Sequence, residues 1–224
     1  MLRHQQNNNL ELYWLPAYRG LSVQVNKAPF VKQYLESLYT VCEQALDQYP
    51  RVFAFRFDLR LPVSNELVID DYNNKLLKKF MSSFKAKIKH NRDMARKENR
   101  YAHDSTVRYV WAREIGQHGK PHYHLAVLLN YDAFCALGKF EMGRDNIFSR
   151  LQEAWASALG LPVSDVAGLV EIPSNPYYKL ICKTPAESNE LDEFGRFFYR
   201  ASYLCKAATK AYTDGQHGFG ASRT

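Results

Sequence analysis

Residues 52–60 read Val-Phe-Ala-Phe-Arg-Phe-Asp-Leu-Arg, and this stretch decides the fold. Every second residue from Phe53 to Leu59 is large and apolar. This alternation predicts a β-strand, because successive strand side chains point to opposite faces. The intervening face carries Arg56 and Asp58, so we expect one face of the sheet to pack in the core and the other to be polar and open.

Helices and strands are predicted on both sides of this strand. Apolar residues recur at helical spacing before it and in a long segment after it, whose start Asp70 or Asp71 would cap. Two strand-like stretches then flank a turn with two glycines, which favours a hairpin. Asp145 and Gly160 bracket a further amphipathic helix. The predicted helices are 28–48, 70–99, 146–159 and 190–210, and the predicted strands are 52–60, 106–115, 122–130 and 167–172.

This order of elements predicts an α+β fold. The sheet would be antiparallel and ferredoxin-like or RRM-like, with helices on one face and the candidate active site on the open face. The same pattern divides the chain into three parts. They are an N-terminal extension with an amphipathic helix over 1–50, the main domain over 51–211, and a flexible, glycine-rich tail over 212–224.

Composition narrows the class of protein. The 224 residues are 46% hydrophobic, which is enough for a substantial core and excludes a wholly disordered chain. The net charge is +7, and the segment 75–100 alone carries ten basic residues against two acids. This concentration of positive charge favours a nucleic-acid partner over a membrane surface. We expect no membrane span and no secretion signal, and the isolated cysteines predict a cytoplasmic protein.

The first candidate site is Pro-His-Tyr-His at residues 121–124. His122 and His124 would share one face of a strand, with Cα atoms about 6.6 Å apart, so both imidazoles can converge on one metal ion. Even-numbered residues of the two hairpin strands can oppose one another, which places Glu114 on the same face. A Glu/His/His set suits Mg²⁺ or Mn²⁺ and also accepts zinc, while exposed strand residues without a metal are the alternative. Three further residues are rival ligands: Asp58, Gln117 and His118.

The second candidate site is Tyr199-Arg-Ala-Ser-Tyr203-Leu-Cys-Lys206 in the last predicted helix. At 100° per residue, Tyr199, Tyr203 and Lys206 fall within about 60° of one another. The apolar residues of this segment fall on the opposite side, so packing does not explain the two phenols. They are candidate site residues, and two exposed tyrosines beside a solvated lysine are the alternative.

Basic residues near these sites are candidates for contacts with a nucleic acid. Arg56 and Arg60 would lie on the open sheet face, and four residues of the 70–99 helix would contact phosphates. A solvated, charged helix face is the alternative for the helix. The four helix residues are Lys78, Lys85, Lys89 and Arg92.

Two motifs make the chain resemble a known superfamily. Pro-His-Tyr-His at 121–124 resembles the HUH motif, in which a hydrophobic residue separates two histidines. The segment 199–206 resembles the tyrosine motif of rolling-circle replication initiators, and its paired tyrosines resemble those of the gene A proteins of small single-stranded-DNA phages. Gly-Lys-Pro-His-Tyr-His at 119–124 and Phe-Gly-Ala-Ser-Arg at 219–223 resemble the replication proteins of inoviruses and of prophage remnants. The resemblance spans roughly residues 50–223.

The resemblance implies a metal-dependent endonuclease that nicks single-stranded DNA and starts rolling-circle replication through a 5′-phosphotyrosine. It implies that His122, His124 and Glu114 hold Mg²⁺ or Mn²⁺. Its implied partners are origin DNA, a host helicase and a host polymerase. An RRM-like nucleic-acid-binding or regulatory protein without catalysis, and an HUH transposase, are the alternatives. The residues with implied catalytic roles are Tyr203, Tyr199 and Lys206.

Overall fold

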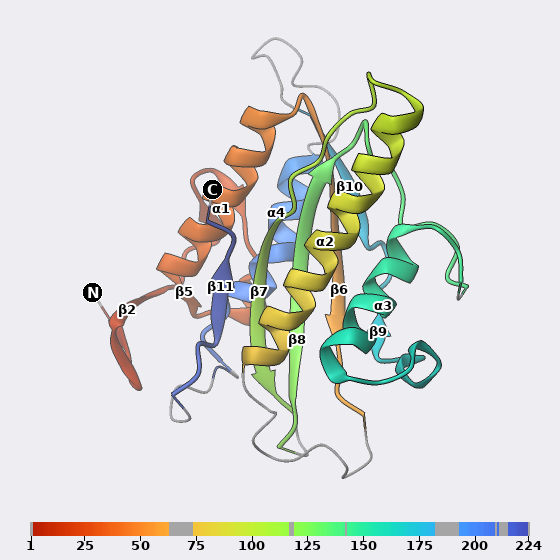
Figure 1. The fold of residues 1–224 in the computed structure, drawn as a ribbon. Helices are drawn as coiled ribbons and strands as arrows, with labels where there is room; N and C mark the ends of the chain where they lie inside the picture. The colour runs from red at the N-terminus through yellow and green to blue at the C-terminus, as the bar shows by residue number, and fades with distance from the viewer. Residues whose placement is uncertain are drawn as a thin grey trace.

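The computed structural model describes residues 2–62, 74–116, 119–141, 143–181, 193–208, 210 and 215–223. Its centre is a six-stranded antiparallel sheet with the strand order β10–β6–β8–β7–β11, in which β9 also pairs with β6 (Figure 1). The predicted mixed α+β architecture with an antiparallel sheet is therefore confirmed. The strands of this sheet are β6 (Arg51–Leu59), β7 (Arg108–Ile115), β8 (Pro121–Asn130), β9 (Val170–Glu171), β10 (Tyr177–Ile181) and β11 (Phe219–Ala221).

Two helices cover one face of the sheet. α2 (Asn74–Glu98) and α3 (Ile147–Leu159) pack against large apolar side chains of β6 and β8, such as Phe55 and Leu125. Trp155 of α3 is fully buried in the same cluster. This layer is the core that the alternating phenylalanines predict, because burying their rings removes a large apolar area from water.

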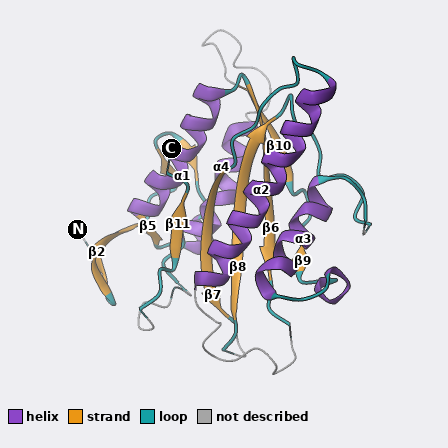
Figure 2. Ribbon diagram, in the orientation of Figure 1, coloured by secondary structure: helices purple, strands orange, loops and turns teal. Residues whose placement is uncertain are grey.

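The other face of the sheet is covered as well, which corrects the prediction that helices lie on one face only. α1 (Lys32–Gln48) and α4 (Glu193–Ala201) pack on this second face (Figure 2). The strands present small and branched side chains to these helices, such as Ala54, Ala112 and Leu128, and all three are buried. On this face the polar residues of β6, Arg56 and Asp58, lie toward the C-terminal end of the strand, so the candidate site lies at the end of a covered face rather than on an open one.

The N-terminal segment adds short strands beside α1. One small sheet has the order β1–β2–β5, and β3 pairs with β4. A 3-10 turn at Val25–Lys27 leads toward β5, and α1 follows β5 directly, within the helix predicted over 28–48. The strands are β1 (Arg3–His4), β2 (Asn7–Tyr13), β3 (Ala17–Tyr18), β4 (Leu21–Ser22) and β5 (Phe30–Val31).

The register of the central strands places the candidate metal ligands. Glu114 on β7 is directly opposite His122 on β8, and Ala112 is opposite His124. β6 flanks β8 on its other side, with Asp58 opposite His124. These even-numbered residues share the face that α1 and α4 cover, so the register follows the parity expected from the sequence.

The C-terminal part of the chain differs from the prediction in two places. The last helix ends at Ala201 and continues as a 3-10 turn over Ser202–Cys205, instead of running to residue 210. β11 lies within the segment predicted to be a flexible tail, and it pairs with β7 as an edge strand of the sheet. β10 lies between the strand predicted over 167–172 and the helix predicted over 190–210, where the sequence predicted neither a helix nor a strand.

The caps of α3 show one smaller difference. Asn146, rather than Asp145, caps the N-terminus, because its side chain accepts a hydrogen bond from the amide of Ser149 at 2.9 Å. Gly160 ends the helix in the left-handed conformation, as predicted. Within the described residues, no helix combines the length and the apolar character needed to cross a membrane. Four residues named above lie outside the described residues: Asp70, Asp71, Gln117 and His118.

Candidate active site

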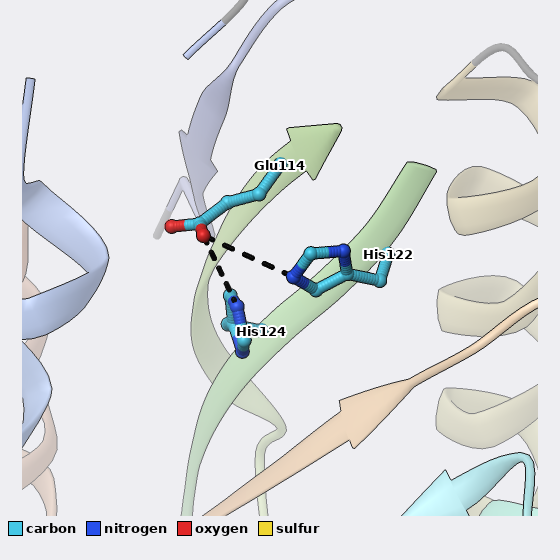
Figure 3. Close-up of side chains that lie close together, drawn as sticks. All are labelled: Glu114, His122 and His124. Carbon is cyan, nitrogen blue, oxygen red and sulfur yellow. Dashed lines mark ion pairs between the residues drawn. The ribbon is translucent and has the colours of Figure 1, made fainter. Parts of the chain in front are cut away.

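Three potential metal ligands meet where β7 and β8 pair. Figure 3 shows Glu114 reaching from β7 toward the imidazoles of His122 and His124 on β8. The Oε2 atom of Glu114 lies 3.8 Å from His122 Nε2 and 3.5 Å from His124 Nε2. The three residues each offer one donor atom, and these atoms all lie within 4.8 Å of one another. The structure therefore brings the three predicted ligands together.

This donor set fits a divalent metal ion. His124 is only 7% exposed, and its buried Nε2 has no hydrogen-bond partner among the described residues. A buried polar atom without a partner is costly, and a bound ion would satisfy it. Mixed nitrogen and oxygen donors suit Mn²⁺ or Zn²⁺ better than Mg²⁺, which prefers oxygen ligands.

Asp58 holds the ring of His124 in place from the other side. Its Oδ1 lies 2.7 Å from His124 Nδ1. In the neutral ring this hydrogen bond keeps the proton on Nδ1, so Nε2 faces Glu114 with a free lone pair. Arg56 Nη2 lies 3.7 Å from the same Asp58 oxygen. Asp58, considered above as a rival ligand, thus contacts the nitrogen that does not face the other ligands.

Two buried lysines face the carboxylate of Glu114. Lys206 Nζ lies 3.1 Å from its Oε2, and Lys210 Nζ lies 3.3 Å from its Oε1. Burial alone would raise the pKa of Glu114, but His124 and the two lysines together hold it well below its usual value. Burial also lowers the pKa of Lys210 to about 8. The carboxylate is therefore ionised at neutral pH and available as a ligand.

The surroundings shift the pKa values of the two histidines in opposite directions. Burial, reinforced by the neighbouring His124, lowers the pKa of His122 below its ordinary value of 6.5. Burial also disfavours the charged form of His124, but Asp58 and Glu114 outweigh that effect and raise its pKa. A metal ion binds only the neutral ring, so His124 is the candidate ligand that would first have to lose a proton.

Tyr203 is the predicted tyrosine that contacts this cluster. Its ring lies edge-on to His124, with centroids 5.3 Å apart. Lys206 Nζ donates a hydrogen bond to the Tyr203 hydroxyl at 2.5 Å, so this ammonium group bridges the phenol and Glu114. The guanidinium of Arg56 lies over the same ring, 5.5 Å from its centroid. A half-buried phenol is thus surrounded by cationic groups beside the metal-ligand set.

The change from α-helix to 3-10 turn positions the two tyrosines. Tyr199 lies in α4, whereas Tyr203 lies in the turn that follows. The last carbonyls of a helix need donors from outside it. Gln24 Nε2 donates to the carbonyls of Tyr199 and Arg200, each at 3.1 Å, and Arg56 Nη1 donates to that of Arg200 at 3.3 Å. The N-terminal segment therefore fixes the point at which α4 ends.

Both tyrosines and His124 line one cavity of about 1080 Å³. Tyr199 is 45% exposed, and Tyr203 is half-buried. The cavity is large enough for a ligand of several rings, because pockets for drug-sized ligands have volumes of roughly 300–1,000 Å³. Its other cationic and aromatic lining residues are Arg56, Tyr177, Tyr178, Arg196 and Arg200.

The residues predicted to contact nucleic acid do not form one surface. Arg56 is buried but lines this cavity. Arg60 is exposed and forms an ion pair with Glu171. Lys78 and Lys85 are exposed on α2, which covers the opposite face of the sheet. Of the predicted set, Arg56 alone lines the cavity described here.

The remaining two predicted contacts also lie on α2 and interact within the protein. Lys89 pairs with Asp93 at 2.8 Å. Arg92 is half-buried, donates a hydrogen bond to Asn91, and lies over the ring of Phe134, 4.5 Å from its centroid. These interactions already account for both side chains.

Sequence reasoning missed two residues that hold the site. Lys210 follows Lys206 by four residues, and this spacing could have indicated that a second lysine lies near the first. Gln24 lies in a segment without periodicity and outside every motif, so nothing in the sequence pointed to it. Both act through contacts between parts of the chain that are far apart in sequence.

Comparison with known proteins identifies relatives over nearly the whole chain. This chain is 31% identical over 200 residues to the uncharacterized protein YfjJ of Escherichia coli strain K12, and the match covers 86% of this chain and 95% of YfjJ. It is 30% identical over 189 residues to the uncharacterized protein YagK of the same strain, covering 79% of this chain and 86% of YagK. No solved structure matches this chain.

The family model of the YagK/YfjJ C-terminal domain matches residues 16–222. The matched range contains Gln24, the three candidate metal ligands, both tyrosines and β11. It therefore includes the N-terminal segment that fixes the end of α4 as well as the sheet. The chain belongs to the YagK/YfjJ C-terminal domain family.

Proposed function

We propose that the protein is an HUH-type endonuclease that cuts single-stranded DNA and becomes joined to it through Tyr203. The observation that carries the proposal is the position of Lys206. Its Nζ lies 2.5 Å from the Tyr203 hydroxyl and 3.1 Å from Glu114 Oε2, which links the tyrosine segment to the metal-ligand set. A nucleophile beside cationic and metal-binding groups in one cavity is the arrangement that phosphoryl transfer requires.

The order of the elements supports this proposal. From β6 to β10 the chain runs strand, helix, strand, strand, helix, strand, and the strands lie side by side in the order β10–β6–β8–β7. The last strand position is shared by β9 and β10, which both pair with β6. This order supports a ferredoxin-like topology, in which the two histidines would lie on an inner strand, β8.

The proposed reaction exchanges one phosphoester bond for another. The Tyr203 oxygen attacks the phosphorus atom, and the bond from phosphorus to the 3′ oxygen breaks. The phenolic proton is lost, and the departing 3′ oxygen takes up a proton. The products are a 5′-phosphotyrosine and a free 3′-hydroxyl. Because the number of phosphoester bonds does not change, the reverse step rejoins the DNA without ATP.

The protein's own groups have separate tasks in this reaction. Lys206 donates its hydrogen bond to the phenolic oxygen and compensates the negative charge that appears there as the proton leaves. Arg56 lies on the same ring and adds positive charge to the cavity. A divalent ion held by Glu114, His122 and His124 would stabilise negative charge on the phosphate oxygens.

Tyr199 is the candidate for a second transfer. It lines the same cavity as Tyr203 but is more exposed. A second nucleophile allows the DNA to pass from one tyrosine to the other, which would cut and close a circular product. The free 3′-hydroxyl from the first cut would prime a host polymerase, with a host helicase separating the strands at the origin.

The test is a search for a covalent protein–DNA adduct. The protein is incubated with a pool of labelled single-stranded oligonucleotides and Mn²⁺, and the products are separated on a denaturing gel. We expect an adduct with the wild-type protein, a loss of at least 100-fold with Tyr203→Phe, and a smaller loss with Tyr199→Phe. His122→Ala should prevent cleavage while DNA binding remains.

Two results would contradict the proposal in different ways. An undiminished adduct in the double variant Tyr199→Phe/Tyr203→Phe would show that the nucleophile is another residue. Salt-sensitive binding without any adduct, whichever divalent ion is supplied, would identify a nucleic-acid-binding protein without catalysis.

A further inference from the structure

A second cavity, of about 900 Å³, is lined by residues of α1, α2, β7 and the C-terminal segment that contains β11. Figure 1 shows β11 at the edge of the sheet, between β7 and α1. Tyr109 and Trp111 of β7 line the cavity, and their odd numbers place them on the face opposite to Glu114. The described lining shares no residue with that of the active-site cavity. Its basic members are Lys78, Lys85, His217 and Arg223, and its aromatic members are Tyr109, Trp111 and Phe219.

The two aromatic side chains lie on β7, next to the edge strand β11. They are two residues apart on one strand, which separates their Cα atoms by about 6.6 Å, and both are half-buried. Gly220 of β11 is directly opposite Trp111. A Cβ atom at Gly220 would lie only 2.6 Å from the indole Nε1, so the missing side chain is what allows Trp111 to lie across β11.

Positive charge surrounds these rings. Lys78 and Lys85 are seven residues apart on the side of α2 that lines the cavity, and both are exposed. Lys85 Nζ lies 5.0 Å from the centroid of the Tyr109 ring, and Arg223 is also exposed. Glu36 is the acidic residue of the described lining, and Arg19 already pairs with it at 2.9 Å. The cavity therefore carries an excess of cationic groups beside aromatic ones.

We propose that this cavity binds a single strand of nucleic acid, at a site separate from the candidate active site. Lys78, Lys85 and Arg223 contact the phosphates, and a base stacks on Trp111. Aromatic side chains on a sheet surface next to basic residues are the platform on which RRM domains bind single strands. A duplex keeps its bases stacked inside, and an acidic peptide supplies charge without a ring, so a single strand matches both features of the cavity.

The test uses Trp111 as the probe in the full chain. Trp14→Phe removes the exposed indole at residue 14, and Trp155 is fully buried, so quenching of the remaining emission reports on Trp111. The protein is titrated with an oligothymidylate in EDTA, where the proposed cleavage cannot operate. In the Trp14→Phe protein without further substitutions, we expect the oligonucleotide to quench the Trp111 fluorescence. Lys78→Gln/Lys85→Gln should weaken binding at least tenfold and reduce the slope of log K against log salt by about 1.4.

The matched control is Lys79→Gln/Lys97→Gln, which removes the same charge from exposed positions of α2 outside the cavity lining. Its affinity should stay within about threefold of the parent. Equal losses in the two double variants would show that binding follows general charge, and an absence of quenching would overturn the site. A polyglutamate peptide that binds as tightly as the oligonucleotide would identify a protein-docking groove instead. The same titration with Tyr203→Phe should be unchanged, so failure of the proposed cleavage would leave this result intact.

Discussion

At the scale of single residues, Asp58 orients the ring of His124 and fixes the tautomer that a metal ion would bind. Its carboxylate lies 2.7 Å from Nδ1, and removing it would release the ring and its tautomer. We predict that Asp58→Ala weakens Mn²⁺ binding by about 10–100-fold, the range for groups that orient a metal ligand. Isothermal titration calorimetry with the purified protein would measure this change.

Asp58→Asn is the control, because an amide oxygen can still accept a hydrogen bond from Nδ1. Its Mn²⁺ affinity should lie between those of the wild-type protein and Asp58→Ala. Full Mn²⁺ affinity in Asp58→Ala would show that the ring needs no partner at Nδ1. His124→Ala, which removes a ligand itself, should cost more than either substitution.

A second residue-scale prediction concerns pH. Although burial alone lowers the pKa of His124, Asp58 and Glu114 raise it above the ordinary value of 6.5. Protons therefore compete with the metal ion, and Mn²⁺ affinity should fall by about tenfold per pH unit below that raised pKa. Titrations at several pH values between 5.5 and 8 would measure it. A constant affinity over this range would contradict the assignment of His124 as a ligand.

The same shift has the opposite consequence for the fold without metal. A raised histidine pKa means that the folded state holds the proton more tightly than the unfolded state does. The resulting stabilisation is fully present below about pH 6.5 and is lost as pH rises through the raised pKa of His124. Chemical denaturation of EDTA-treated protein should therefore show this contribution declining as the pH rises through the raised pKa of His124, and His124→Gln should remove the decline.

The grouping of the three candidate metal ligands was open to prediction from the sequence for a simple reason. Side chains alternate along a strand, so the spacing of His122 and His124, together with the hairpin, determined which residue could oppose them. Lys210 was not predictable in the same way. Its position depends on how the chain turns after Lys206, and the helical geometry assumed for that segment does not hold.

At the scale of elements, the junction between α4 and the 3-10 turn controls where the tyrosines lie. Gln24 donates two hydrogen bonds to carbonyls at the end of α4. Gln24→Ala would leave these groups short of donors, so we predict a loss of about 1–2 kcal/mol in the free energy of unfolding. The yield of covalent adduct should fall as well, because Tyr203 follows the junction.

Gln5→Ala is the matched control for this prediction, since Gln5 is an exposed glutamine of the same N-terminal segment. Urea denaturation and the adduct assay, run on both variants, would separate the two effects. Equal stability of both variants would show that solvent replaces the Gln24 hydrogen bonds. Reduced stability with an undiminished adduct would show that the junction supports the fold without positioning the tyrosine.

Helix periodicity alone could not locate this junction. The apolar residues of 194–205 fit a continuous helix, and the phenols of Tyr199 and Tyr203 fall on its other side. In the structure the helix stops at Ala201, because Gln24, Arg56 and Ser202 satisfy its last carbonyls from outside the regular helical pattern. Only contacts across the fold determine such an end. The two tyrosines nevertheless line one cavity.

At the scale of the whole molecule, both faces of the sheet are buried. Alternation along β6 distinguished a large apolar face from a face with Arg56 and Asp58, and these charged residues suggested that the second face is exposed. Val52 and Ala54 are in fact buried under α1 and α4, where small side chains allow helices to approach closely. The strand's own residues could not reveal this, because the covering helices come from the two ends of the chain. Arg56 and Asp58 are polar because the site lies beside them.

The last strand tests whether the C-terminal segment belongs to the same folded unit. β11 pairs with β7, and the buried ring of Phe219 stacks on Tyr34 of α1 with centroids 4.2 Å apart. A chain ending at Gly218 loses both interactions, and losing a buried phenylalanine ring costs about 3–5 kcal/mol. Its melting temperature should therefore fall by about 6–20 °C in circular dichroism. A chain ending at Ser222 keeps β11 and should melt with the full-length protein. Equal melting temperatures of the two truncated chains would mean that β11 does not stabilise the sheet. The strand across which the Trp111 side chain lies would then not be stably paired with β7.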